Sequence, residues 1–355
     1  ALFTVAGLGL ATAILIIPNC FRDSVSELLG FQWDIVQRQD MNLGLVEPAS
    51  VQVRDLLRQL PGVIAAEPFR GAAARIRHGN HHRQIGIVGV PADTQHSRVI
   101  DAKYREILLP RDGMVVSIKL AEVLDAKVGD ELTVEFLEGR RLVRSVPLVG
   151  VSEDLTGIAA HMDLQALNRL LGEGDVINGA SFTLDMAHRA EFLHALKEIP
   201  RISWVGIKES LRDNFRKTTA ASINLIQSIY LVFAVVVAIG VVYNNARISL
   251  AERARELATL RVIGFSEREV GAVLITELTI LALIALPIGL LLGTGFAKGI
   301  VSAVNTETVR LPVIFTLHNY AFATMVVTVA SAISALVVLR RLKELNLVSA
   351  LKAPE

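Results

Sequence analysis

The sequence predicts a membrane protein with four transmembrane α-helices and a large α+β extracytoplasmic domain inserted between helices 1 and 2. The 355 residues are 52% hydrophobic and have a mean hydropathy of +0.47. Apolar residues gather in four runs of 18 to 27 residues, and a helix needs about 20 residues to cross the roughly 30 Å hydrocarbon core. Between the first and second runs lies a long region of ordinary soluble composition. The four runs are 1–18, 223–243, 270–296 and 321–339.

The first run predicts transmembrane helix 1 over residues 1–19. A signal peptide is the alternative, but the run has neither a charged n-region nor an A-x-A cleavage site. The chain starts inside this run without a Met, so we interpret it as a piece of a longer protein.

The region after the first helix is predicted to be an extracytoplasmic α+β domain over residues 20–207. Residues 21–219 carry 25 basic and 27 acidic side chains, so there is no basic surface and nucleic acid is not an expected partner. The single cysteine, Cys20, excludes a disulfide framework.

Two strand–helix–strand units, near 41–69 and 179–207, are predicted to bracket a β-rich insertion over 71–178. Each unit shows alternating apolar residues, then apolar residues at helical spacing, then a proline that stops the helix. Inside the insertion, Asp163 is predicted to cap a short helix that Gly172 ends.

The rest of the chain alternates between apolar helices and short polar segments. Its loop 244–269 carries five arginines and the tail after the last run carries four basic residues, against two in the short loop between runs three and four. By the positive-inside rule the loop and the tail face the cytoplasm, and the large domain lies outside. The predicted elements are a helical stalk 208–221, transmembrane helix 2 at 222–243, a cytoplasmic coupling helix and turn 244–265, helix 3 at 266–297, an outer loop 298–317, helix 4 at 318–340 and a cytoplasmic tail 341–355.

The loop 244–269 has the most specific pattern in the chain. Its leucines fall near one face of a predicted helix. Its arginines and glutamates form oppositely charged pairs at i,i+3 spacing. Ser266 and Glu269 form a capping box that predicts the start of the third membrane helix. Five Arg and four Glu give little attraction to anionic lipid, so the pattern favours docking on a protein partner over lying on the membrane. The candidate docking residues are Glu252, Arg253, Glu256, Leu257, Leu260, Arg261 and Gly264.

The run Glu252-Arg253-x-x-Glu256-Leu257-x-x-Leu260-Arg261-x-x-Gly264 resembles the cytoplasmic signature of the FtsX-like permease family, which includes permeases of the macrolide-exporter and lipoprotein-releasing kinds. The order of helices is similar, and the layout of the outer domain resembles that family's periplasmic domain. The family's cytoplasmic segment before helix 1 is missing, so the chain corresponds to one four-helix half or to a truncated chain.

The resemblance implies a permease subunit of an ABC-type transporter in the bacterial cytoplasmic (inner) membrane. It implies that the coupling helix docks on a separate cytoplasmic ATPase, which binds ATP while this chain holds no cofactor. Motion driven by ATP would pass through the stalk to the outer domain, which handles export or release of a substrate. The implied partners are the ATPase, the lipid bilayer, a second permease copy or half and, as a further candidate, a periplasmic adaptor.

No catalytic motif opposes this interpretation. The chain lacks the phosphate loop G-x-x-x-x-G-K-[ST], as well as H-E-x-x-H and G-x-S-x-G, so it is not expected to be an enzyme. The alternative function is a membrane scaffold or signalling protein whose outer domain regulates a cell-wall enzyme or senses a ligand.

Polar and small residues inside the third apolar run are further candidates. Glu277 is costly in a bilayer, so it marks an intramembrane polar site, either for helix–helix hydrogen bonding or for gating or proton transfer. Two G-x-x-x-G motifs let helices approach closely, within the chain or with a second permease half. They consist of Gly289, Gly293, Gly295 and Gly299.

Three histidines cluster at 78–82, a pattern that Zn²⁺ sites share. Gly79-Asn80 between them is typical of a hairpin turn, and flanking arginines would repel a cation. The sequence therefore favours an exposed turn over a metal site.

Overall fold

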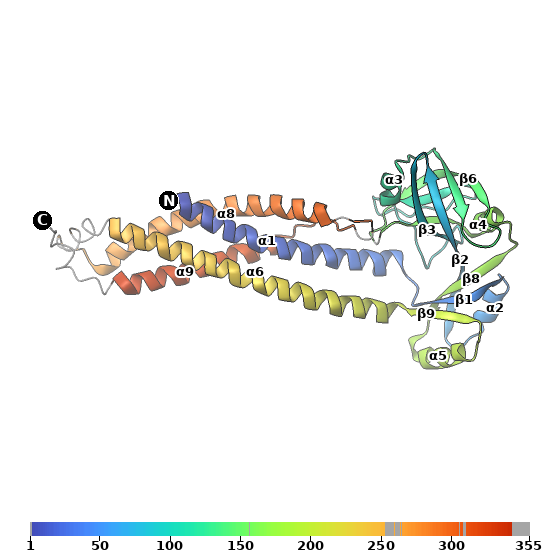
Figure 1. The fold of residues 1–355 in the computed structure, drawn as a ribbon. Coiled ribbons are helices and arrows are strands. Elements are labelled where there is room, and N and C mark those ends of the chain that lie inside the picture. The colour runs from blue at the N-terminus through green and yellow to red at the C-terminus, as the bar shows by residue number, and fades with distance from the viewer. Residues whose placement is uncertain are drawn as a thin grey trace. The chain divides into compact units, whose positions relative to one another are not determined.

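The computed structural model describes residues 2–155, 157–252, 259, 263, 265–304, 306–307 and 310–342. The chain forms two compact units, which we call the helix bundle and the α+β domain (Figure 1). The helix bundle comprises Ala1–Val25, Thr219–Ala303 and Val313–Glu355. The α+β domain comprises Ser26–Thr218 and Val304–Pro312.

Among the described residues, four helices form the bundle, and all are long and apolar enough to cross a membrane. Helix α1 is the most enclosed, with 56% of its most apolar stretch buried against 17–24% for the others. The predicted fold class is confirmed, since a large α+β domain follows the first of these helices. The helices are α1 (Leu2–Gly30), α6 (Lys208–Glu252), α8 (Glu267–Val304) and α9 (Leu317–Leu342).

The helices extend beyond the apolar runs that predicted them. Helix α1 passes the predicted end at residue 19 and continues into a π-helical turn, η1 (Phe31–Val36). Helix α6 is one helix from Lys208 through Glu252, so it covers the predicted stalk and transmembrane helix 2 and continues past residue 243. Hydropathy marks where apolar side chains stop, whereas no Gly or Pro between 241 and 252 stops the backbone hydrogen bonds.

The two predicted strand–helix–strand units form one antiparallel sheet in the order β2-β8-β1-β9. Helices α2 and α5 connect its strands, which gives the split βαβ arrangement of ferredoxin-like folds. Its core contains Met41, Phe182 and Phe192, with the two phenylalanine rings 5.3 Å apart. The elements are β1 (Met41–Ser50), α2 (Val53–Leu57), β2 (Val63–His78), β8 (Val176–Leu184), η2 (Met186–His188), α5 (Arg189–Lys197) and β9 (Ile202–Ile207).

The β-rich insertion is a closed barrel. Its strands pair in the order β3-β7-β4-β6-β5-β2, and the pairing of β2 with β3 closes the ring. Alternate residues such as Ile76, Leu132 and Val134 fill the barrel core. The elements are β3 (His81–Val90), β4 (Met114–Ser117), α3 (Ile118–Leu124), β5 (Glu131–Phe136), β6 (Val143–Ser152), β7 (Ala160–Asp163) and α4 (Leu164–Leu171).

Strand β2 belongs to both parts of the α+β domain. Its first half pairs with β8 in the ferredoxin-like sheet, and its second half, from Arg70, pairs with β3 in the barrel. The local signals in this region are confirmed. Asp163 accepts a hydrogen bond from Ala166 N at the start of α4, and Gly172 ends that helix in the left-handed conformation with φ +67°.

Candidate functional site

Helix α6 directly connects the α+β domain to the predicted cytoplasmic loop. It begins at Lys208, the residue after the last strand, β9, and ends at Glu252. At 1.5 Å per residue its 45 residues span about 68 Å. The helix is continuous between these two residues.

The first turns of α6 are held by the segment that follows α1. Lys208 N donates to Asp40 O at 3.0 Å, and Arg212 bonds Asp34 at 3.0 Å. The rings of Trp33 and Phe215 meet edge to face with centroids 5.7 Å apart. The two chain segments that enter the α+β domain are therefore fixed to each other at its base.

One candidate docking residue, Glu252, is described by the structure: it is the last residue of α6 and is exposed. The others lie outside the described residues: Arg253, Glu256, Leu257, Leu260, Arg261 and Gly264. The capping box is confirmed, since Ser266 N donates to the Glu269 carboxylate at 2.7 Å and Glu269 N approaches Ser266 Oγ at 3.4 Å. Hydrogen bonding to Ser266 lowers the pKa of Glu269.

The two glycine motifs have different surroundings. A Cβ placed on Gly289 would lie 2.6 Å from Gly9 O of α1, and one on Gly293 would lie 2.8 Å from Ala13 Cα. These two glycines therefore allow α8 to approach α1 closely. Gly295 and Gly299 face open space, with no atom of the described residues within 4 Å.

Glu277 is half-buried in α8. The neighbouring hydroxyls of Thr276 and Thr279 bond their own helix, at Ala272 O and Ile275 O, both at 2.8 Å. They are therefore committed to the backbone of α8 rather than to the Glu277 carboxylate.

Polar pairs that the sequence analysis missed link the bundle helices. Gln227 Nε2 of α6 donates to Asn19 Oδ1 of α1 at 2.8 Å. Thr316 Oγ1, just before α9, donates to Asp23 Oδ2 of α1 at 2.8 Å. The available signal was the position of Asn19 and Gln227 among apolar residues, where a polar group needs a partner.

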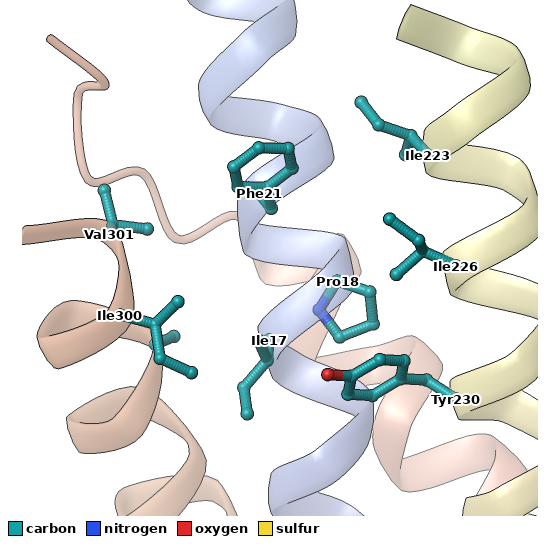
Figure 2. Close-up of a pocket in the computed structure, with 9 residues that line it drawn as sticks. Ile17, Pro18, Phe21, Ile223, Ile226, Tyr230, Ile300 and Val301 are labelled. Carbon is teal, nitrogen blue, oxygen red and sulfur yellow. The ribbon is translucent and has the colours of Figure 1, made fainter. Parts of the chain in front are cut away.

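An apolar pocket of about 170 Å³ lies between α1, α6 and α8 (Figure 2). Pro18 contributes the wall from α1, and Tyr230 reaches from α6 toward α1. The remaining lining is aliphatic or aromatic, so the pocket suits an alkyl or aryl group rather than an ion. Its lining residues are Ile17, Pro18, Phe21, Ile223, Ile226, Tyr230, Ala297, Ile300 and Val301.

Arg70 lies where β2 passes from the ferredoxin-like sheet into the barrel. Its side chain is only 2% exposed. The guanidinium donates to Glu138 at 2.7 Å, to Glu173 at 3.2 Å and to Gly71 O at 2.6 Å. A buried charge persists only when its donors are used in this way, so the network fixes the junction between the two parts. No local pattern in the sequence indicates this network.

The histidine cluster forms the turn between β2 and β3, where His78 pairs with His81 and Gly79 has φ +55°. His78 Nδ1 lies 3.1 Å from Leu124 O, and its Nε2 lies 3.6 Å from Asp130. The turn is therefore attached to the barrel through one imidazole.

Comparison with known proteins identifies the C-terminal third of the chain. Residues 228–347 match the family model described as FtsX-like permease C-terminal, which confirms the predicted resemblance over this segment. No curated protein matches the chain in sequence.

Two solved structures are similar to parts of the chain. The periplasmic region of MacB from Actinobacillus actinomycetemcomitans is 11% identical with a TM-score of 0.36, over 52% of this chain and 95% of that chain. The extracellular domain of the noncanonic ABC-type transporter YknZ from Gram-positive bacteria is 16% identical with a TM-score of 0.34, over 45% of this chain and 94% of that one.

Proposed function

We propose, starting from the FtsX-like permease C-terminal domain at residues 228–347, that this chain is a permease subunit of an ABC-type transporter. It would pass motion driven by ATP from a cytoplasmic ATPase to the α+β domain outside. That domain would handle export or release of a substrate.

The observation that carries this proposal is the continuity of α6. One end of the helix follows β9 directly, and the other end carries Glu252, the first residue of the candidate docking run. The capping box at Ser266 starts α8 just beyond that run. A partner that pushes on the loop between these helices would therefore act on two long helices, one of which leads directly into a sheet.

The proposed partners follow from this role. The loop would dock on a separate ABC ATPase that binds the ATP, and the exposed apolar faces of α6, α8 and α9 would contact lipid or a second permease copy or half. The location would be the bacterial inner membrane, with the α+β domain outside and available to a periplasmic adaptor. The sequence contains no phosphate loop of its own.

The test is affinity purification of the full-length parent protein from native membranes, with ATP hydrolysis measured in the purified material. We expect an ATPase to co-purify with the wild type and to be lost with Glu256→Lys, because the substitution reverses a charge in the docking run. Membrane insertion should be unchanged.

The matched control is Glu47→Lys, which makes the same charge change at an exposed position of β1. This variant should keep its ATPase. Full ATPase recovery and transport with Glu256→Lys would remove Glu256 from the docking role. Absence of any ATPase from gently solubilised wild type would contradict the proposal and favour a scaffold or sensor.

A further inference from the structure

We propose that the described residues 306–307 and 310–312 between α8 and α9, which we call the anchoring loop, form a second transmission element. The anchoring loop would carry movement of α8 and α9 to the barrel, while α6 carries movement to the ferredoxin-like sheet. This inference rests on the proposed function and adds a route and its residues to it.

The anchoring loop belongs to the same compact unit as the α+β domain, although it connects two helices of the bundle. Its first contact is with the histidine-containing hairpin of the barrel. Arg83 of β3 holds the Glu307 carboxylate through Nη2 at 2.8 Å and Nε at 3.1 Å. Hydrogen bonding to Arg83, with a smaller contribution from the charge of Lys119, lowers the pKa of Glu307. Two hydrogen bonds from one guanidinium to one carboxylate fix the orientation of Glu307 as well as its distance from Arg83.

The second contact lies at the segment between β6 and β7. Arg310 N donates to Leu155 O at 3.0 Å, and its guanidinium lies 3.5 Å from Glu153. The next residue, Leu311, is only 5% exposed. A backbone hydrogen bond and a buried leucine do not depend on salt as a surface ion pair does, so this contact holds when the Arg83 pair is screened.

The chain immediately after the anchoring loop is fixed to the bundle. Lys298 of α8 lies over the ring of Phe315 at 5.9 Å, and Thr316 bonds Asp23 of α1 at 2.8 Å. The five residue steps from Arg310 to Phe315 can span about 18 Å at most, since an extended chain covers up to ~3.6 Å per residue. A tether this short transmits pulling with little slack.

Through the anchoring loop the barrel has a connection to the helix bundle that does not pass through the ferredoxin-like sheet. By sequence it is an insertion between β2 and β8, so its covalent links lead only to the ferredoxin-like sheet. The anchoring loop ties it to α8 and α9 instead. Because residues 253–266 join α6 to α8 in the chain, one event there would act on the sheet through α6 and on the barrel through α8.

The contact itself is tested by cross-linking in native membranes. The full-length parent with Cys20→Ala receives Arg83→Cys and Glu307→Cys, and a short bis-maleimide is added. We expect efficient cross-linking. The control replaces Arg83→Cys by Arg140→Cys, at the end of the barrel away from the β2–β3 turn, and should give little product. Equal yields for the two pairs would overturn the proposed placement of the loop.

Transmission is tested by hydrogen exchange of the transporter with its ATPase, at rest and after vanadate trapping. In the wild type we expect exchange to change both at β9 and α5 and at residues 78–83 of the barrel, the β2–β3 turn that Glu307 contacts through Arg83. In Glu307→Arg the change in the barrel should be lost and the change at β9 kept. The charge-swapped double variant Arg83→Glu with Glu307→Arg should restore the change in the barrel.

Persistence of the barrel change in Glu307→Arg would overturn the second route while leaving α6 as the transmission helix. A wild-type transporter with no change anywhere in the α+β domain would instead refute the proposed function, and the second route with it. If the anchoring loop had a merely structural role, Glu307→Arg would lower the stability of the barrel at rest without altering how the barrel responds to trapping.

Discussion

Gly289 provides a direct test of how α8 packs on α1. In Gly289→Ala the new methyl carbon would lie 2.6 Å from Gly9 O and 2.9 Å from Gly9 Cα, both backbone atoms of α1. Backbone atoms cannot rotate away as a side-chain tip can, so the two helices must separate. Gly299→Ala makes the same chemical change on the same helix, with no described atom within 4 Å.

The magnitude comes from comparing these two variants. Alanine gains up to about 1 kcal/mol of helix propensity over glycine, and this gain is common to both positions. Overpacking at a close contact costs about 1–3 kcal/mol and applies only at Gly289. We therefore expect Gly289→Ala to be less stable than Gly299→Ala by about 1–3 kcal/mol.

The assay uses Cys20, the single cysteine of the chain, which is buried in α1. In mild detergent its labelling by a maleimide requires local opening of the bundle, so the labelling rate reports the free energy of opening. The expected difference corresponds to labelling about 5- to 150-fold faster in Gly289→Ala than in Gly299→Ala. Equal rates in the two variants would refute the packing of α8 on α1 at this position.

Three other predictions concern the α+β domain and the start of α8. Arg70→Met leaves two partly exposed carboxylates without their cation and should lower the free energy of unfolding of the full chain by about 2–4 kcal/mol. The control Arg140→Met, at an exposed position, should lower it by less than ~1 kcal/mol. Equal losses in the two variants would contradict the role of Arg70 at the junction. Because Arg83 lowers the pKa of Glu307 from 4.5, protection of the anchoring loop against exchange should persist above that pH and be lost as the pH falls through the lowered value; Glu307→Gln should abolish this transition, and its survival would assign it to another group. Glu269→Ala removes one half of a capping box and should increase exchange at the first turn of α8 by about 2- to 5-fold; unchanged exchange would show that the cap does not stabilise that turn.

The sequence predicted correctly those features that are set by residues close together in the chain, such as helix caps and tight turns. Asp163 and Gly172 set the two ends of α4 because a side-chain acceptor and a left-handed residue act within one helical turn. The capping box at Ser266 and the turn at Gly79 have the same short range. Helix existence in the bundle followed equally well from the length of the apolar runs.

Contacts between distant segments could not be predicted in this way. In the barrel, β3 pairs in parallel with β7, a strand more than 60 residues away in the chain, and no periodicity specifies that pairing. The ion pair of Arg83 with Glu307 joins residues 224 positions apart. The candidate docking run was visible because its residues are consecutive, whereas the anchoring loop offers only ordinary residues whose partners lie elsewhere.

The shared strand β2 also makes the barrel a module. The chain enters the barrel after Arg70 and returns at β8, where the Asn178 side-chain amide bonds both N and O of Gly71 at 2.8 and 2.7 Å. Entry and exit are therefore neighbours, as at the two ends of a hairpin. Replacing residues 72–175 by a short turn would leave the sheet-forming part of β2, the other three strands of the ferredoxin-like sheet and both of its helices in sequence. The barrel can thus be enlarged, exchanged or removed without redesigning the sheet that precedes α6.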